Sequence, residues 1–273
     1  MTYRTILALA QPGPEAAARL QIAAALAART GAILDAVFVR PLFVPAPASM
    51  DFGGYIPPAT LDAMIESHRA AVGEAEAAAQ ASFRAAVAAM RPRAEWFALE
   101  ETSALGFVGL ARRADLVVFP KSGTTAPRLG AMDLAHDAGA PLLLTPASPT
   151  SVDTGRRVLV AWNGSREAAS ALRAAWPVLE QAERVEVVMV DPPPEAEAFL
   201  GMHLQRHGIE AHIHIEHAAD ARAGEVIRTQ AERLGADLVV MGLYGHSRLR
   251  ELVLGGASRT MLGQEGLPLL VSR

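Results

Sequence analysis

The C-terminal part of the chain contains a series of glycines whose spacing suits the binding of a phosphate group. Gly242 and Gly245 are separated by two residues, and nine further residues lead to Gly255 and Gly256. Glycine permits positive φ and leaves room for a ligand close to the backbone. Consecutive N–H groups just before a helix attract an anion, and the helix dipole adds to this. The spacing therefore predicts a phosphate-binding loop.

Neighbouring residues would complete this site. Met241 ends the apolar run that precedes the loop, and Ala257 and Ser258 begin the expected helix after it. His246 and Arg248 would add cationic donors to a phosphate, unless both simply face solvent. The glycines alone are equally consistent with ordinary turn chemistry.

Other patterns of known chemistry are missing from the sequence. There is no G-x-x-x-x-G-K-[ST] and no G-x-G-x-x-G after a first strand, so P-loop and dinucleotide-binding sites are excluded. The chain has no cysteine, which excludes disulfides, thiolate metal sites and a cysteine nucleophile. We expect no catalytic residue of an enzyme, beyond a slow hydrolysis of ATP at most.

Five histidines lie close together in the sequence, but they do not form a convincing metal site. Two of them have the i, i+4 spacing of a zinc pair, yet no carboxylate or cysteine pattern completes the ligand set. Solvated or edge-strand histidines are the favoured interpretation, and no metal is expected. The five are His203, His207, His212, His214 and His217.

Three further charged residues stand next to apolar strands. Asp115 and Asp237 occupy matching positions before two such strands, where capping of backbone N–H groups is expected rather than acid–base chemistry. Lys121 stands where the first half of the chain lacks the glycines. It could pair with a nucleotide or with a carboxylate.

The elements that must position the glycine loop occur twice along the chain. Apolar runs recur in the same order, and the proline of the last run recurs with them. Four matches in one order indicate a duplication. The matching segments are 4–10 with 156–162, 32–41 with 184–192, 114–122 with 236–247, and 138–146 with 265–273.

Each half alternates apolar strands with amphipathic helices, which predicts an α/β fold with a five-stranded, mostly parallel sheet flanked by helices. The predicted domains are residues 1–147 and 155–273, joined by a Ser-, Thr- and Pro-containing linker. The difference in residue number between matching segments falls from 152 at the first strand to 122 at the fourth. The first half therefore has about thirty extra residues before its fourth strand. These form a loop at 41–58 and a helix over 60–90.

The net charge and the lengths of the apolar runs limit the kinds of partner that the chain can bind. The net charge is −4, which argues against nucleic acid as a partner. No apolar run approaches the length of a membrane span, and the N-terminal residues lack the pattern of a signal peptide. We therefore expect a soluble, cytoplasmic protein that does not contact a membrane.

The pattern G-x2-G-x9-G after the fourth strand of a duplicated five-strand unit resembles the universal stress protein family. The similarity covers nearly the whole chain as two tandem copies. It implies a Rossmann-like fold of the adenine nucleotide alpha hydrolase type, ATP binding in some members, and pairing through the last strand. AMP or ADP are alternatives to ATP as the nucleotide.

The resemblance also assigns residues to parts of the nucleotide. Gly242 and Gly245 would line the ribose and phosphates, and the segment from Gly255 to Ser258 would hold the phosphates. Ala161 and Asn163 match positions that meet adenine and ribose, and Met189 would face the base.

Two residues depart from the family pattern. Gly256 stands where a serine or threonine is usual, and Asn163 stands where aspartate is common. Each change removes a side-chain contact of about 0.5–1.5 kcal/mol while backbone donors remain. The first half lacks the spacing altogether, so no nucleotide is expected there.

Three functions remain open from the sequence. The first is an ATP-binding regulatory module of the stress response, whose occupancy alters the surface offered to partner proteins. The second is an interaction protein that has lost nucleotide binding, and the third is a slow ATP hydrolase that uses His246 and Arg248.

The two halves should pair as an intramolecular pseudo-dimer through 142–144 and 269–271, because an exposed apolar edge strand invites aggregation. A homodimer of whole chains and unknown protein partners also stay open.

Overall fold

The computed structural model describes residues 2–45, 56–102, 106–122, 126–149, 151–218, 222–243 and 256–273. Strands and helices alternate in both halves, as the repeat predicts. In the first half they are β1 (Thr5–Ala10), α1 (Pro14–Thr30), β2 (Ile33–Arg40), α3 (Pro58–Met90), β3 (Arg93–Glu100), α4 (Gly106–Ala111), β4 (Leu116–Pro120), α5 (Ala131–Ala138) and β5 (Leu142–Thr145).

The second half repeats this order with shorter helices. Its elements are β6 (Arg157–Trp162), α6 (Arg166–Leu179), β7 (Arg184–Val190), α7 (Ala196–Arg206), β8 (Ala211–Glu216), α8 (Ala223–Leu234), β9 (Leu238–Gly242), α9 (Gly256–Leu262) and β10 (Leu269–Ser272). The described residues contain no helix long and apolar enough to cross a membrane.

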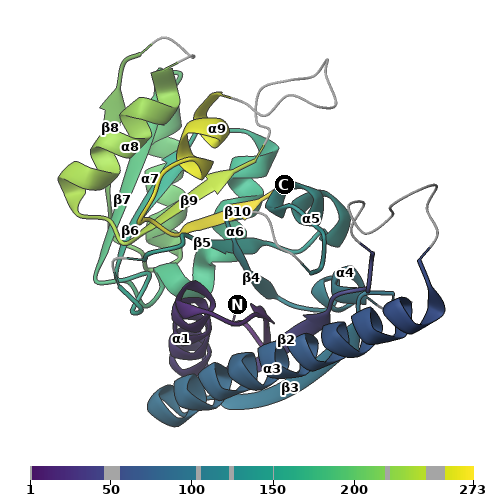
Figure 1. Ribbon diagram of the computed structural model, residues 1–273. Helices are drawn as coiled ribbons and strands as arrows, with labels where there is room; N and C mark the ends of the chain where they lie inside the picture. The colour runs from purple at the N-terminus through teal and green to yellow at the C-terminus, as the bar shows by residue number, and fades with distance from the viewer. Residues whose placement is uncertain are drawn as a thin grey trace.

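The ten strands form one sheet in the order β3-β2-β1-β4-β5-β10-β9-β6-β7-β8 (Figure 1). Neighbouring strands are parallel within each half, and the β5–β10 pair between the halves is antiparallel. Leu269 lies opposite Leu144, and Leu270 lies opposite Leu143. The predicted pairing of the two last strands is confirmed. The division into two domains stays a prediction, because the halves share this sheet.

Helices cover both faces of the sheet, so successive strand residues are buried on opposite sides. On β1, Ile6 and Ala8 belong to the hydrophobic cluster under α1, α3, α6 and α7, whereas Leu7 and Leu9 belong to the cluster under α4, α5, α8 and α9. Strands buried on both faces read as continuous apolar runs. This explains why the strands are recognisable in the sequence.

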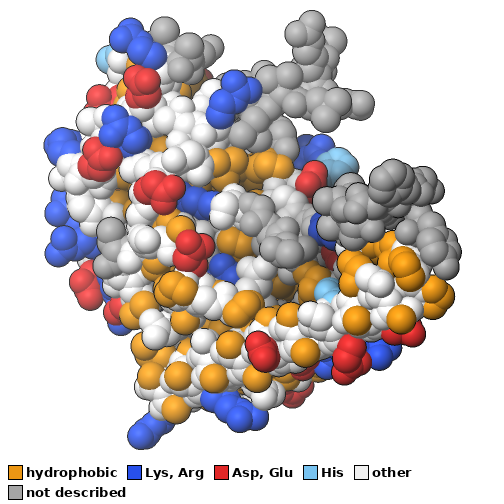
Figure 2. All heavy atoms as spheres, viewed as in Figure 1, with side chains coloured by type: hydrophobic (Ala, Val, Ile, Leu, Met, Phe, Trp, Pro, Cys, Tyr) orange, Lys and Arg blue, Asp and Glu red, His pale blue; other side chains and the backbone are white. Residues whose placement is uncertain are grey.

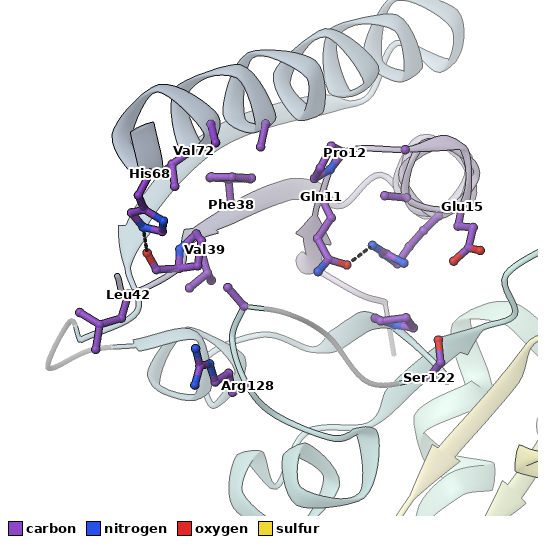
Figure 3. Close-up of a pocket in the computed structure, with 18 of the residues that line it drawn as sticks. Gln11, Pro12, Glu15, Phe38, Val39, Leu42, His68, Val72, Ser122 and Arg128 are labelled. Carbon is purple, nitrogen blue, oxygen red and sulfur yellow. Dashed lines mark hydrogen bonds between the residues drawn. The ribbon is translucent and has the colours of Figure 1, made fainter. Parts of the chain in front are cut away.

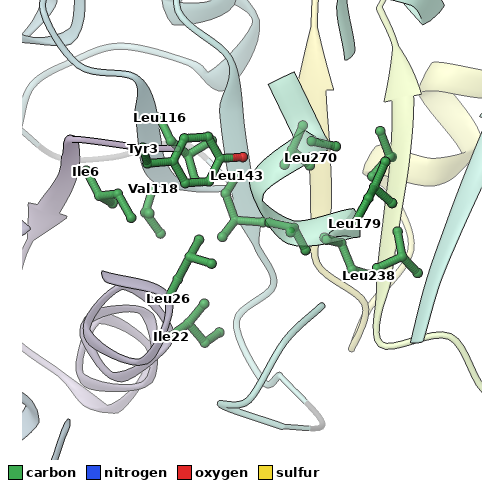
Figure 4. Close-up of a cluster of buried hydrophobic side chains, with 14 of the residues drawn as sticks. Tyr3, Ile6, Ile22, Leu26, Leu116, Val118, Leu143, Leu179, Leu238 and Leu270 are labelled. Atoms are coloured by element: carbon green, nitrogen blue, oxygen red, sulfur yellow. The ribbon is translucent and has the colours of Figure 1, made fainter. Parts of the chain in front are cut away.

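The first of these clusters runs from one half to the other (Figure 4). Tyr3 and Leu26 of the first half and Leu238 of the second are buried in it together with the strand pair Leu143 and Leu270. The Tyr3 hydroxyl also donates to the carbonyl of Ala174 at 2.5 Å. Apolar burial and main-chain hydrogen bonds therefore hold the halves together.

The long helix predicted in the first half is α3, whose counterpart in the second half is the shorter α7. Helix α3 packs beside α1 and β2, and its buried residues are Ala79, Phe83 and Ala86. Its N-terminal part extends past the carboxyl ends of the strands (Figure 1). Figure 2 shows hydrophobic and charged side chains interspersed along its exposed face. Only part of this helix is needed for packing onto the sheet.

Candidate functional site

The predicted nucleotide site lies where the strand order of the second half reverses. From β6 the chain moves outward to β7 and β8, then returns to place β9 on the other side of β6. Ligands of open α/β sheets bind at such a point, beyond the carboxyl ends of the strands. Ala161 of β6 lies opposite Met241 of β9 at this edge. The structure therefore brings these two predicted residues together.

Asn163 follows directly after β6 and is exposed at the same edge. Its Oδ1 accepts a hydrogen bond of 3.1 Å from the backbone N–H of Ser165. Ser165 in turn caps α6, because its hydroxyl accepts from the backbone N–H of Ala168 at 3.1 Å. This local network fixes the turn from β6 into α6 beside Ala161.

Gly242 ends β9, as predicted, and the structure gives a packing reason for the glycine. A Cβ atom at this position would lie 2.5 Å from the Ala168 backbone nitrogen and 2.5 Å from the Glu167 carbonyl carbon. Any larger residue would push β9 away from the first turn of α6. The glycine is needed for this close approach, whatever ligand lies above it.

The helix after the loop begins at Gly256, which is exposed, while Ser258 is buried. This helix, α9, rests on the start of α8 through another glycine. A Cβ atom at Gly224 would lie 2.8 Å from the Ala257 Cα and 2.7 Å from the Thr260 Cβ. The predicted motif does not include Gly224, although its small size sets the position of α9.

Four predicted site residues lie outside the described residues. They are Gly245, His246, Arg248 and Gly255. Their roles stay predictions from the motif.

The structure does not place Met189 with the other predicted residues. Its side chain is fully buried and belongs to the cluster beneath α6 and α7. Ala161 and Met241 pack with the cluster on the opposite face of the sheet. Because side chains alternate along a strand, the next residue, Val190, points to the face of Ala161. The buried side chain of Met189 thus lies on the face opposite Ala161, contrary to its predicted place with the other site residues, whereas Val190 shares the face of Ala161.

Among the described residues, Lys121 forms no ion pair with a carboxylate, although such a pair is one of the two contacts considered from the sequence. Its Nζ donates to the carbonyls of Met261 at 3.2 Å and Gln264 at 2.9 Å, at the end of α9. A cation there satisfies free carbonyls and interacts favourably with the helix dipole. A residue of the first half thus holds the helix that follows the glycine loop of the second half.

Burial lowers the pKa of Lys121 to about 8, while Glu265 opposes part of this shift. A lysine with a lowered pKa binds fewer protons when folded than when unfolded, so stability should rise between about pH 8 and pH 10.5. Lys121 is also the sole lysine of the chain. We expect its acylation by an amine-selective reagent to have a midpoint near pH 8, measured by peptide mass spectrometry. A midpoint near pH 10.5 would contradict this burial.

The capping prediction for the two aspartates is confirmed. Asp115 accepts from the backbone N–H groups of Arg4 at 2.7 Å and Thr5 at 2.9 Å. Asp237 accepts from three successive N–H groups at the start of β6, beginning with Gly155 at 2.7 Å. Both halves therefore use an aspartate to cap the backbone N–H groups at the start of their first strand.

The interpretation of the histidines as solvated or edge-strand residues is confirmed, because His203, His207, His212 and His217 are exposed and His214 lies on the edge strand β8. His203 and His207 pack against Trp176, with ring centroids 5.6 and 4.4 Å from it. His214 Nε2 lies 2.6 Å from the buried carboxylate of Glu186. Among the described residues, no three histidine, aspartate or glutamate side chains are grouped to hold a metal.

Comparisons with known proteins agree on one family. No protein-family model matches the chain. The curated universal stress protein Slr1230 of Synechocystis sp. is 31% identical over 178 residues, which cover 58% of each chain. The match thus spans little more than half the length of that relative.

Two solved structures share the fold over nearly the whole chain. A universal stress protein from Archaeoglobus fulgidus superposes with a TM-score of 0.70 at 17% identity, covering 98% of both chains. A putative universal stress protein from Pseudomonas aeruginosa gives 0.58 at 16% identity, covering 99% of this chain and 93% of that one. These likenesses show that the chain has the tandem α/β fold of these universal stress proteins.

Proposed function

We propose that the C-terminal half binds an adenine nucleotide, ATP in the first place and ADP or AMP as alternatives, and that the chain acts as a binding module in a stress response. The observation that carries this proposal is the pairing of Ala161 with Met241 across the switch point. The glycine motif begins directly after Met241, so the strand ends and the motif meet at the edge where α/β sheets bind ligands.

Each described residue has a part in this proposal. Adenine would lie against Ala161 and Val190, which share one face of the sheet. The ribose would approach Asn163, and the phosphates would lie over Gly242 toward the start of α9. No residue in this set is a strong general base, so the bound nucleotide would act by occupancy rather than by turnover. Occupancy would alter the surface that the C-terminal half presents to partner proteins.

Two substitutions that restore the family pattern should strengthen ATP binding. Asn163→Asp supplies a charged acceptor for a ribose hydroxyl and keeps an oxygen for the Ser165 N–H. Gly256→Ser supplies a hydroxyl at the start of α9. Each contact is worth about 0.5–1.5 kcal/mol, so we expect an affinity gain of about two- to tenfold in calorimetric titrations. No gain from either change would argue against the assigned ribose and phosphate positions.

Mass spectrometry of nucleotide that co-purifies with the native protein would identify the ligand. ATP, ADP or AMP in the native sample supports the proposal. If nucleotide binds only after Gly256→Ser, the chain is an interaction protein that has lost this ligand. Steady phosphate release that falls with His246→Ala and Arg248→Ala would instead favour a slow hydrolase.

A further inference from the structure

The first half contains a cavity at the place where the second half is predicted to bind nucleotide. Its volume is about 680 Å³, which is within the range of small-molecule sites. It lies at the carboxyl ends of β1, β2 and β4 and extends under the N-terminal part of α3 (Figure 3). Its two ends differ in chemistry, and that difference indicates the class of ligand.

The polar end is formed by the turn between β1 and α1. Arg19 lines the cavity there, although it is only 3% exposed. Its Nε donates to the carbonyl of Leu9 at 2.9 Å, and its Nη2 donates to Gln11 Oε1 at 2.9 Å. Among the described residues, Arg19 forms no ion pair and its Nη1 donates to no acceptor. The structure therefore buries a cation whose two hydrogen-bond partners are neutral, and Glu15 attracts it without forming an ion pair.

This arginine is peculiar to the first half. With the offset of 152 between α1 and α6, Arg19 corresponds to residue 171 (19 + 152), which is Ala171. Ala171 lies on the buried face of α6 and packs in the hydrophobic core. A buried charge costs free energy unless it is paired, so folding alone does not account for the arginine. Burial lowers the pKa of Arg19 to about 10, while the charge of Glu15 opposes part of this shift, so Arg19 is charged at neutral pH.

The other end of the cavity is apolar. Phe38 at the end of β2 and Val72 of α3 face each other there (Figure 3), and Leu42 and Val44 continue this wall. Leu42 is 51% exposed and Val44 is 52% exposed, so this wall is open to a ligand. Val72 belongs to α3, which has 33 residues where the corresponding helix of the second half, α7, has 11. The longer helix and the arginine of the first half thus meet at one cavity.

Other charged and titratable groups at the cavity have partners or lie at its rim. His68 Nε2 lies 3.0 Å from the carbonyl of Pro41. Glu15 and Arg128 are exposed, and the carboxylate of Glu101 accepts from the backbone N–H groups of Leu42 and Arg128. Few free groups remain to read the polar edge of a nucleotide base. Among the described residues that line the cavity, Arg19 is the buried charged group that forms no ion pair.

We propose that this cavity binds a small organic anion with an apolar body, such as a medium-chain carboxylate, whose acid group pairs with Arg19 and whose body lies between Phe38 and Val72. The ligand differs in class from the nucleotide proposed for the second half. Arginine suits this role, because its planar fork pairs with carboxylates through two parallel hydrogen bonds.

The test is a calorimetric titration of the full chain with decanoate and, separately, with decan-1-ol and acetate. Decanoate should bind more tightly than either, because it alone combines charge and apolar body. Arg19→Met keeps the side-chain volume but removes the charge. It should reduce the affinity for decanoate about ten- to a hundredfold, as expected for the loss of a charged hydrogen bond. The affinity for decan-1-ol should change by no more than about twofold. Arg19→Lys should restore part of the affinity.

A second pair of variants tests the apolar wall without touching a buried residue. Val72→Asp places a charge in the wall, whereas Ala77→Asp makes a similar change on the exposed side of the same helix. Decanoate binding should be lost in the first and kept in the second. Equal binding of decanoate and decan-1-ol, unchanged binding in Arg19→Met, or equal loss in both helix variants would each overturn the proposal. ATP binding in the second half should be unaffected by Val72→Asp, so the two proposals fail separately.

Discussion

Leu270→Asp should abolish the folded state of the chain or drive it into oligomers. Leu270 is fully buried and lies opposite Leu143 in the only antiparallel strand pair among the described residues. An unpaired carboxylate there costs several kcal/mol, a large share of the roughly 5–15 kcal/mol that stabilises a typical domain. We expect loss of the cooperative denaturation transition, or a shift to large species in size-exclusion chromatography.

Phe199→Asp is the matched control, because Phe199 is 66% exposed on α7. Its effect on the free energy of unfolding should stay within about 0.5 kcal/mol. A monomeric Leu270→Asp chain with native stability would show that the two halves do not depend on this strand pair.

Gly224→Ala should disturb α9 and weaken ATP binding from a distance. The added Cβ would lie 2.8 Å from the Ala257 Cα, and both this atom and the nearby Thr260 belong to α9. Overpacking of this kind costs about 1–3 kcal/mol. We expect this loss of stability in denaturant titrations and, because α9 follows the glycine loop, an ATP affinity reduced on the order of tenfold.

Gly201→Ala makes the same chemical change in α7, where the nearest atom would be the Ile213 Cδ1 at 3.5 Å. Alanine favours a helix over glycine, so this control should stabilise the chain by up to about 1 kcal/mol. It should leave ATP binding unchanged. Equal behaviour of the two variants would mean that the contact between α8 and α9 does not position the loop.

Much of the fold could be predicted because the sequence contains it twice. The apolar runs recur in the same order, and the structure confirms their parallel pairing within each half. The meeting of Leu142–Thr145 with Leu269–Ser272 followed from the need to cover two apolar edge strands. The matching positions of Asp115 and Asp237 predicted their capping bonds. Local patterns and repetition were sufficient for these features.

The errors and omissions concern contacts between distant elements. The family resemblance assigns Met189 to the base, but the alternation of side chains along β7 turns it to the other face of the sheet. Nothing near Lys121 in the sequence identifies the helix end that it caps, some 140 residues away. Gly224 looks like any glycine at the start of a helix until α9 is placed against it. Tertiary packing decides all three.

The two halves have kept the fold while their sites have diverged. The second half has the glycine motif and Ala171 on the buried face of α6, whereas the first half lacks the motif and has Arg19 and the longer helix α3. Lys121 of the first half holds the end of α9 in the second. This contact provides a physical connection through which occupancy of one half could affect the other.

Titration calorimetry of ATP into the native chain and into Ala161→Glu tests the central claim most directly. Ala161 lies beside Met241 at the switch point, so a carboxylate there would repel the phosphates and crowd the base. We expect one ATP per chain in the native protein, no binding to Ala161→Glu, and native binding to Phe199→Glu. Native binding to Ala161→Glu, or no heat from the native chain at millimolar ATP, would contradict a nucleotide site at this edge of the sheet.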